Sequence, residues 1–182
     1  MQRVMIIGQP GSGKSTLARH LGEITHLPVF YMDHIHWQSG WIERSVKEKV
    51  QLVAETHAKP QWIFEGGFSR GWEERLQRAD TLIWLDLPLW LRSWRVAKRT
   101  LRYWGRTRPD LPSGCPEQVS FEFYQWIWNT RKTARAKCKA TLENAPLEKS
   151  TFHLRNPREV RQFLIQIKRA LDAGDLGLPH RP

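Results

Sequence analysis

"IIGQPGSGKSTLARHLG", residues 6–22, carries the pattern that decides the fold. The apolar run at residues 3–7 predicts a short buried strand, and residues 14–22 predict a helix with Leu17 and Leu21 on one face. The loop between them fits G-x-x-x-x-G-K-[ST] at every position from Gly8 to Ser15. A strand, this loop and a helix, in that order, are the context in which the motif binds phosphate.

Each residue type in the loop has a physical role in holding phosphate. Glycine lets the backbone take positive φ and approach a ligand closely, so that successive N–H groups point inward beside the helix N-terminus. Lys14 can reach the β- and γ-phosphates, and the Ser15 hydroxyl can bind Mg²⁺. We therefore expect a nucleoside triphosphate, ATP with Mg²⁺, rather than a chance glycine-rich turn. The residues expected to bind it are Gly8, Pro10, Gly11, Ser12, Gly13, Lys14, Ser15 and Thr16.

The composition is typical of a globular protein, with a strong positive charge. The chain has 182 residues, a formal net charge of +11 and no apolar run near the roughly 20 residues of a membrane span. Residues 1–5 lack a signal-peptide layout, so we expect a cytoplasmic protein. The charge indicates polyanionic partners (nucleic acid, nucleotides or anionic membrane) or only an arginine-rich phosphate site, and of these partners we expect no membrane. Cys115 and Cys138 are expected to be reduced thiols.

Short apolar strands alternate with helical patterns along the chain. We expect strands at residues 3–7, 29–32, 61–64, 81–85 and 150–154. Helices are expected at 14–22, 45–58, 70–78, 89–103, 117–142 and 157–171, with a loop at 105–116 and a flexible Gly/Pro-rich tail at 173–182. This alternation is typical of an α/β fold with a parallel sheet, helices on both faces, and ligands at the carboxyl edge of the strands.

Apolar spacing predicts which side of two helices faces the core. In the helix at 45–58 the shared apolar face consists of Val46, Val50, Val53 and Ala54. In the basic helix at 89–103 the predicted inner side consists of Trp90, Trp94, Ala97 and Leu101. Most of the ten tryptophans are expected in the core or under a lid.

Three acidic residues lie at or just after the ends of expected strands, where they could face the nucleotide or the acceptor. Asp33 could hold Mg²⁺ through water or accept a proton from the acceptor, or it could only cap the following turn. Glu65 could bind the magnesium ion, and Gly66 beside it leaves room for a ligand, although a purely structural role is open here too. Asp86 is expected to be structural.

Arginines follow two of the expected helices at helical spacing. Arg92, Arg95, Arg99 and Arg102 form one stripe, and Arg131 and Arg135 lie four apart on a later helix. Phosphoryl transfer needs positive charge on the migrating group, and arginine makes bidentate contacts to phosphate oxygens. The two helices flank a Pro/Gly loop, which predicts a lid that closes over the triphosphate, unless the arginines form only a solvated basic face.

These features resemble the P-loop kinases of the adenylate kinase and shikimate kinase type. The closer resemblance is to the bacterial "DNA topology modulation protein" family, related to adenylate kinase, through "MDHIHW", "WIFEGGFSR", "ADTLIWLDLP", "RPDLPSGCPE" and "LRNPREV". It implies a three-layer α/β/α sandwich with a five-stranded parallel sheet in the order 2-3-1-4-5 and a helical lid. It further implies one P-loop kinase domain over residues 1–172, with a lid insertion at about 103–130.

The resemblance implies roles for the arginines on the nucleotide side. Arg95 would lie against the adenine, and Arg99 would touch the triphosphate. Arg131 and Arg135 would contact the transferring phosphoryl group. The loop from Arg155 to Pro157 would border the adenine through its backbone.

On the acceptor side the resemblance implies that Arg70 holds the acceptor's phosphate, with Arg44 as a second candidate. Glu65 stands where adenylate kinases have aspartate, and an extra glycine before Arg70 is closer to the shikimate kinase layout. The segment between Asp33 and Trp62 is short and lacks a clear cradle for a nucleoside monophosphate.

Two functions are consistent with these patterns. The first is ATP- and Mg²⁺-dependent phosphoryl transfer to a small acceptor, which we expect to be a nucleotide, with Lys14, Asp33, Arg99, Arg131 and Arg135 as catalytic residues. The second is a nucleic-acid-associated ATPase, motivated by the charge and by segments such as "FEFYQWIWNT". The oligomeric state is open.

Overall fold

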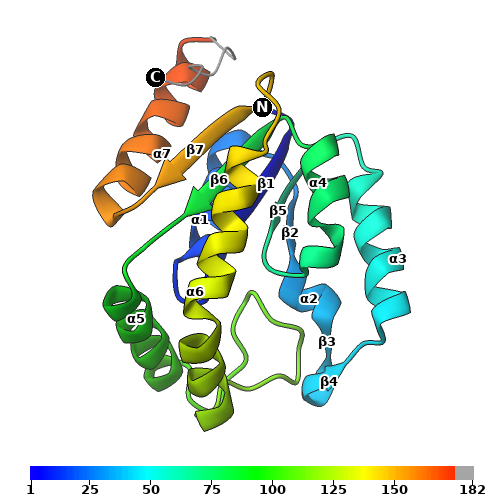
Figure 1. The fold of residues 1–182 in the computed structure, drawn as a ribbon, viewed down its shortest axis with the longest axis vertical. Coiled ribbons are helices and arrows are strands. Elements are labelled where there is room, and N and C mark those ends of the chain that lie inside the picture. Colours follow the sequence, from blue (N-terminus) through cyan, green and yellow to red (C-terminus); the bar gives the residue numbers. More distant parts are fainter. Residues whose placement is uncertain (175–182) are drawn as a thin grey trace.

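A five-stranded parallel sheet forms the centre of the computed structural model, which describes residues 1–174 (Figure 1). Its spatial order is β2-β5-β1-β6-β7, and every neighbouring pair is parallel. Counted along the chain, these five strands lie in the order 2-3-1-4-5, which confirms the expected topology. Their bounds are Arg3–Gly8 (β1), Val29–Tyr31 (β2), Trp62–Glu65 (β5), Thr81–Leu85 (β6) and Ser150–Leu154 (β7).

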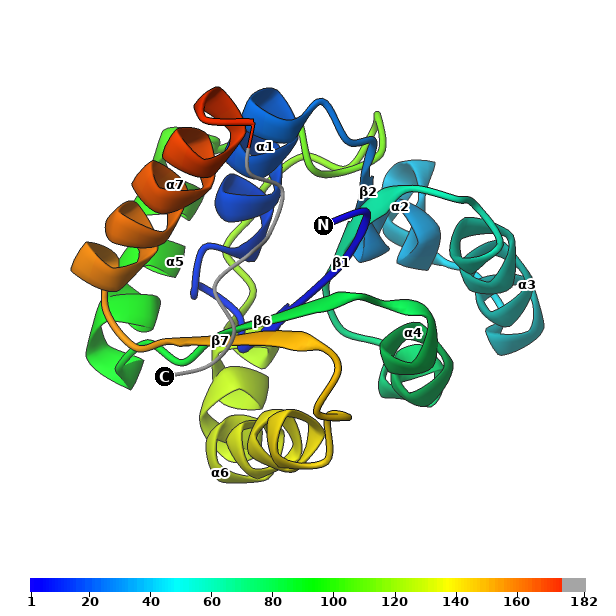
Figure 2. The same cartoon turned by 90° about the horizontal axis from the view of Figure 1, so that it is seen from above.

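Helices cover both faces of this sheet, as Figure 2 shows. On one face lie α1 (Lys14–Thr25) and α7 (Pro157–Asp172), and on the other α3 (Val46–His57), α4 (Trp72–Arg78) and α6 (Phe121–Glu143). Helix α5 (Leu89–Arg102) lies beside the carboxyl edge of the sheet. The sequence did not predict α2 (Met32–His36) or the small hairpin of β3 (Trp37–Gln38) and β4 (Ile42–Glu43) that follows it.

The two layers of core follow from the alternation of side chains along each strand. In β1, Val4 and Ile6 pack in the cluster that includes Leu17 of α1, while Met5 and Ile7 pack in the opposite cluster. All four of these β1 side chains are fully buried. A strand with both faces buried must be apolar throughout, which is why the run at residues 3–7 shows no polar alternation.

Local caps explain where several helices begin. Ser45 and Glu48 form a reciprocal capping box at the start of α3. The Asn156 side chain accepts a hydrogen bond from the Glu159 N–H, and Pro157 occupies the first turn of α7. Ser120 caps α6 in the same way, so this helix begins after residue 120 rather than at the expected residue 117.

The predicted inner side of α5 was wrong. Trp90, Trp94 and Leu101 are exposed, and the residues that face inward are Arg92, Val96 and Thr100. The Arg92 guanidinium donates to the carbonyl oxygens of Leu87 and Pro10, at 3.1 and 3.2 Å. Buried backbone carbonyls need donors, so the arginine face of α5 turns toward the chain and the apolar face turns outward.

The predicted inner face of α3 was wrong at three of its four positions. Val46, Val50 and Ala54 are exposed, whereas Val53 is buried together with Lys49, Thr56 and His57. The Lys49 ammonium is buried because it pairs with the Glu43 carboxylate on β4 at 2.5 Å. Here an ion pair, rather than apolar spacing, sets the rotation of the helix.

Residues 103–120 form a loop between α5 and α6, closed by isolated bridges between Trp104 and Glu117 and between Thr107 and Pro116. Cys115 in this loop is buried, and its thiol donates to the Gln38 carbonyl oxygen at 3.1 Å. Both cysteines are free thiols, as expected. Most of the predicted tail, from residue 175 onward, lies outside the described residues. Between residues 1 and 174, none of the helices has the length and apolar character needed to cross a membrane.

The orientation of α5 can be tested by a pair of truncations. Val96→Ala should lower the free energy of unfolding by about 2 kcal/mol, because this side chain is 1% exposed. Leu101→Ala should change it by about 0.5 kcal/mol or less, because Leu101 is 73% exposed. Urea unfolding of both variants measures the difference. The reverse order of destabilisation would mean that the apolar side of α5 faces the core.

Candidate active site

The loop after β1 has the backbone geometry of a phosphate-binding loop. Gly11 and Gly13 take positive φ of 76° and 94°, which side chains rarely allow. A Cβ atom on Gly11 would lie 2.4 Å from the Arg92 carbonyl oxygen, so only glycine fits between this loop and α5. Helix α1 begins directly after Gly13, with Lys14, Ser15 and Thr16 in its first turn. This arrangement brings the predicted phosphate-binding residues together.

Arginine side chains of α5 and a backbone carbonyl of α6 hold the loop from outside. Arg92 donates to the Pro10 carbonyl oxygen at 3.2 Å, and Arg95 donates to the Ser12 carbonyl oxygen at 3.1 Å. The Gln9 side-chain amide donates to the Arg131 carbonyl oxygen of α6 at 2.7 Å. Gln9 was not predicted as a site residue, and Arg92 was predicted only as a member of the arginine stripe over the triphosphate. The arginine stripe was the available signal for Arg92, whereas Gln9 occupies a position that the motif leaves unspecified.

Three polar side chains of the loop could bind phosphate or a hard cation such as Mg²⁺. The Ser12 hydroxyl oxygen is buried and has no hydrogen-bond partner among residues 1–174. The Lys14 ammonium donates to the Gln9 carbonyl oxygen at 3.4 Å, at the rim of the loop. The Ser15 hydroxyl donates to a Glu65 carboxylate oxygen at 3.3 Å. A hydroxyl and a carboxylate side by side are oxygen ligands of the kind Mg²⁺ takes together with water and phosphate.

Glu65 is the last residue of β5 and lies between β1 and β2, opposite Ile6 and Tyr31. It is buried, and burial raises its pKa to about 7. The negative charge of Asp33 acts in the same direction, whereas Lys14 and the hydrogen bond from Ser15 lower the pKa. A buried carboxyl group whose pKa lies near neutral pH is typical of a functional site. A bound cation would favour its charged form.

Asp33 follows β2 directly, in the first turn of α2. Its carboxylate forms no hydrogen bond with any group in residues 1–174, and Tyr31, not Asp33, is the N-cap of the helix. Asp33 follows β2 and Glu65 ends the neighbouring strand β5, so the two carboxyl groups lie at the same edge of the sheet. The alternative role for Asp33, capping a turn, therefore has no hydrogen bond to support it.

The two arginines predicted on the acceptor side, Arg44 and Arg70, differ in whether their guanidinium groups already have partners. One guanidinium nitrogen of Arg44 donates to the carbonyl oxygens of His34, Ile35 and Trp37, at 2.8, 3.0 and 2.8 Å. Arg44 therefore holds the end of α2 and the start of the hairpin. Arg70 is exposed in the short turn after β5, and within the described chain its side chain has no hydrogen-bond or ion-pair partner. Of these two candidates, Arg70 has no partner on its guanidinium within residues 1–174, whereas Arg44 is anchored through one of its guanidinium nitrogens.

Gly66 is fixed by its neighbours. Its N–H donates to the Ile6 carbonyl oxygen at 3.2 Å, and its own carbonyl oxygen accepts from Arg75 at 3.2 Å. Arg75 is fully buried, with its guanidinium 3.6 Å from the centre of the Phe64 ring. Arg75 was not predicted as a buried residue, because a charged residue on a short helix is usually solvated. Its contact with Gly66 sets the path of the chain where β5 ends.

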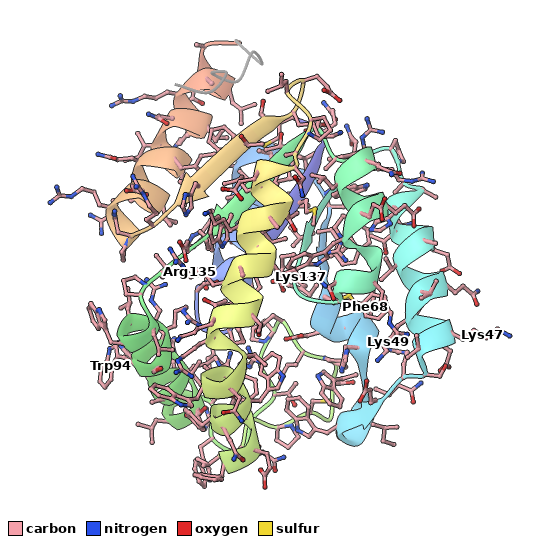
Figure 3. All side chains as sticks on the ribbon, viewed as in Figure 1. Lys47, Lys49, Phe68, Trp94, Arg135 and Lys137 are labelled. Atoms are coloured by element: carbon pink, nitrogen blue, oxygen red, sulfur yellow. The ribbon has the colours of Figure 1, made fainter. Side chains whose placement is uncertain are left out.

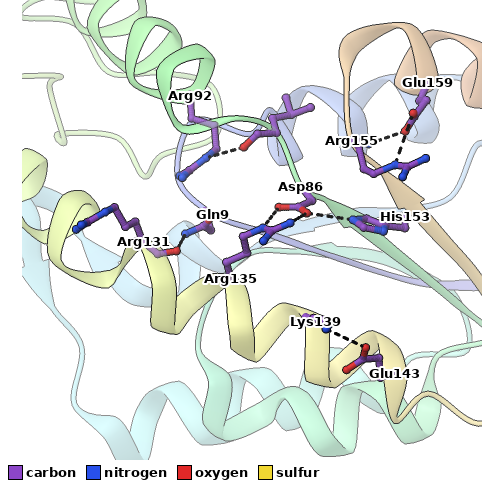
Figure 4. A network of polar contacts seen from close by, with 11 residues as sticks. Gln9, Asp86, Arg92, Arg131, Arg135, Lys139, Glu143, His153, Arg155 and Glu159 are labelled. Atoms are coloured by element: carbon purple, nitrogen blue, oxygen red, sulfur yellow. Dashed lines mark hydrogen bonds and ion pairs between the residues drawn. The ribbon is translucent and has the colours of Figure 1, made fainter.

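The three predicted catalytic arginines each have a partner in this structure. Arg99 pairs with the Glu117 carboxylate at 3.1 Å. The Arg131 guanidinium lies 3.9 Å from the centre of the Trp128 ring and points away from Asp86 (Figure 4). Arg135 makes a two-pronged contact with Asp86, both hydrogen bonds being 2.8 Å long (Figure 4). The structure thus places Arg135 at the end of β6, whereas Arg99 and Arg131 are bound elsewhere.

Asp86 follows β6 and joins α6 to β7. It accepts from Arg135 and lies 3.2 Å from a ring nitrogen of His153, which stacks on Trp84 (Figure 4). Although burial opposes it, the hydrogen bonds from Arg135 and His153 hold the pKa of Asp86 below its usual value. This set of contacts supports the structural role expected for Asp86.

The loop predicted to border the adenine follows β7. The Arg155 N–H donates to the Glu159 carboxylate at 2.6 Å, and Pro157 is the first residue of α7. Among the described residues no cluster of three His, Cys, Asp or Glu side chains could hold a metal ion by itself. A cation beside Ser15 and Glu65 would therefore need further ligands from water or phosphate.

The sheet order and the phosphate loop at its edge are those of P-loop kinases. No protein-family model matches the chain. A curated protein that matches is the shikimate kinase of Paracidovorax citrulli (strain AAC00-1), which is 32% identical over 130 residues, 62% of this chain and 68% of that protein. The chain therefore belongs to the shikimate kinase family.

Solved structures agree on the fold. A shikimate kinase from Acinetobacter baumannii in complex with shikimate has a TM-score of 0.57 and 15% identity, with 97% of this chain and 96% of that chain covered. A shikimate kinase from Bacteroides thetaiotaomicron has a TM-score of 0.51 and 14% identity, with 94% and 98% covered. At such identities the likeness extends to the fold alone. None of these matches bears on the narrower resemblance to the "DNA topology modulation protein" family, which stays a prediction.

The raised pKa of Glu65 predicts a pH-dependent cost in stability. In the unfolded chain this carboxyl has a pKa near 4.5, against about 7 in the folded protein. As the pH rises between these values the unfolded state loses its proton first, so the folded state loses stability and the loss is complete above the folded pKa. Without nucleotide or divalent cations, Glu65→Gln should therefore gain stability relative to the wild type between about pH 5 and about pH 8.

Denaturant unfolding across this pH range measures the effect. Glu148→Gln is the matched control, because Glu148 is exposed. Its difference from the wild type should stay constant with pH. If the Glu65→Gln difference is equally flat, the carboxyl has an ordinary pKa in the folded protein.

Proposed function

We propose that this protein transfers the γ-phosphoryl group of ATP to the hydroxyl group of a small carboxylic acid. The observation that carries the proposal is the edge of the sheet where the phosphate loop, the Ser15–Glu65 pair and Asp33 meet. A triphosphate cradle beside a free carboxylate is the arrangement that phosphoryl transfer to a hydroxyl needs.

The phosphate loop binds the donor in this proposal. The N–H groups of residues 11–16 and the Lys14 ammonium hold the β- and γ-phosphates, and the Ser12 hydroxyl donates to a phosphate oxygen. To do so, Lys14 exchanges its contact with the Gln9 carbonyl for phosphate. The loop from Arg155 to Pro157 and the aliphatic part of Arg95 border the adenine.

Ser15 and Glu65 would hold Mg²⁺, and Asp33 would be a further oxygen ligand on the same side. The ion supplies charge that offsets the phosphates and fixes their orientation. Glu65 contributes its carboxylate in the ionised form, which the ion favours over the protonated form. Because this carboxylate is buried, its position is set by β5 and does not depend on solvent.

Asp33 accepts the proton of the acceptor hydroxyl as the oxygen attacks phosphorus. Arg70 binds the anionic end of the acceptor. Since Nη1 of Arg44 is held by three backbone carbonyls, Arg70 is the predicted acceptor arginine whose whole guanidinium has no partner within residues 1–174. One guanidinium matches a carboxylate in a two-pronged contact, whereas a phosphate dianion usually meets more positive charge. Together with the family, this favours a hydroxylated carboxylic acid such as shikimate over the nucleotide expected from the sequence.

The segment at residues 103–130 acts as a lid over the triphosphate. When it closes, Arg99 leaves Glu117 and contacts the phosphates. Arg131 likewise leaves the Trp128 ring and contacts them. Arg135 already stands at the end of β6, beside the phosphate loop. Three arginines around the migrating group would offset the charge that develops during transfer.

An acceptor panel tests the proposal. ADP formation should rise above the acceptor-free rate with shikimate and less, or not at all, with nucleoside monophosphates and nucleosides. Lys14→Ala should lower kcat/KM by about 100-fold or more, because it removes a charge from the transferring phosphate. Lys47→Ala, an exposed lysine on α3, is the control and should leave the rate unchanged. A rate with no dependence on any acceptor would contradict the kinase function.

The role of Asp33 has a separate test. Asp33→Asn should lower kcat by between about 100- and 10,000-fold, because the amide cannot accept the proton. The KM for ATP should stay within about threefold, since the donor site is built from other residues. Asp172→Asn, at the exposed end of α7, serves as the control. Full activity of Asp33→Asn would show that no proton passes through this side chain.

A further inference from the structure

A stripe of large apolar side chains runs along the outer face of α5. We call Trp90, Trp94, Ala97 and Leu101, with Trp104 just beyond the helix, the α5 stripe. Trp90, Trp94, Leu101 and Trp104 are 71%, 60%, 73% and 61% exposed. Trp94 points away from the body of the molecule (Figure 3). Contiguous apolar surface of this kind marks a place where a protein meets a partner or a membrane.

The other face of α5 keeps the stripe outside. Arg92 and Arg95 donate to carbonyl oxygens of the phosphate loop, and Val96 is buried beneath them. Turning the helix to bury the tryptophans would break both hydrogen bonds and move two guanidinium groups. Within residues 1–174 the stripe is therefore a stable feature of the surface, and no rotation of α5 that keeps these hydrogen bonds would bury it.

Positive charge borders the stripe. Residues 89–108 contain seven lysines and arginines and no acidic residue. Within residues 1–174, the exposed side chains of Lys98, Arg102 and Arg106 form no ion pair. The carboxylates that follow in the chain are already engaged, Asp110 with Arg108 and Glu117 with Arg99. An occupant of this surface must therefore be apolar at its centre and negative around it.

Three occupants can be compared on these grounds. A second copy would bring the same unpaired cations against Lys98 and Arg102, in a protein whose net charge is +11. Single-stranded nucleic acid could stack on the tryptophans, but it offers nothing apolar to the exposed aliphatic side chain of Leu101. An anionic lipid surface supplies both an acyl layer for Trp94 and Leu101 and negative headgroups for the cations.

We propose that the α5 stripe binds this protein peripherally to anionic membrane surfaces. The helix lies in the plane of the interface, with the tryptophans at headgroup level and Leu101 deeper. Lys98, Arg102 and Arg106 contact lipid phosphates. The sequence led us to expect no membrane partner, and the proposal departs from that expectation because Trp90, Trp94 and Leu101 are exposed.

Vesicle sedimentation with the full chain tests this proposal. The protein should bind vesicles of phosphatidylglycerol mixed with phosphatidylcholine, and binding should weaken as salt is added. Pure phosphatidylcholine vesicles should bind much less. The double variant Trp94→Gln/Leu101→Gln should lower the partition coefficient by about tenfold or more. Leu147→Gln, which changes an 88% exposed leucine outside the stripe, should leave it unchanged.

A charge-reversed pair tests the second half of the surface. Lys98→Glu/Arg102→Glu should also lower binding by about tenfold or more. Lys47→Glu/Lys168→Glu, with the same change of net charge at exposed positions on α3 and α7, should lower it far less. Thermal unfolding checks that every variant is folded.

Three results would overturn the proposal. One is equal binding to anionic and neutral vesicles. Another is a wild-type dimer in sedimentation velocity that becomes monomeric in Trp94→Gln/Leu101→Gln. The third is binding to a single-stranded oligonucleotide that both stripe variants abolish, with no binding to vesicles. None of these readouts depends on kinase activity.

Discussion

Two arginine side chains hold the phosphate loop in shape, and the arrangement of the surrounding elements depends on them. A loop that turns its N–H groups inward leaves carbonyl oxygens on its outer side, and these need donors. Arg92 and Arg95 supply them to Pro10 and Ser12. Helix α5 must therefore lie against the loop with its arginine face, at a distance so short that position 11 tolerates only glycine.

The second constraint is the parallel sheet, which gathers groups from distant parts of the sequence at one edge. Ser15 begins the helix after β1, Glu65 ends β5 and Asp33 follows β2. Because β2, β5 and β1 are neighbours in the sheet, two carboxylates and a hydroxyl from distant parts of the sequence lie at the same edge. In this arrangement Glu65 is buried, which disfavours its charged form and raises its pKa, and the positive charge of Lys14 offsets part of this rise.

The sequence predicted those features that local chemistry determines. The phosphate motif dictates its own backbone, and apolar strands alternating with helices predicted a parallel sheet covered on both faces. The strand order, which the structure confirms, came from the resemblance to P-loop kinases. The buried faces of α3 and α5 were predicted wrongly. Apolar spacing locates the apolar side of a helix, but it does not show that Lys49 or Arg92 forms a polar contact that turns another side of the helix inward. Arg44 shows the same limit: its residue type suggested anion binding, whereas three carbonyls already occupy it.

The two faces of α5 let one helix serve two purposes that do not compete. Its inner face is fully used in holding the phosphate loop, and the stripe shares no residue with that face. Figures 1 and 2 place α5 and α2 on opposite sides of β1 and the loop that follows it. Asp33, on α2, therefore lies across the molecule from the stripe. A membrane covering the stripe would leave the acceptor side facing water, so a dissolved acceptor could reach Asp33 while α5 stays at the lipid surface.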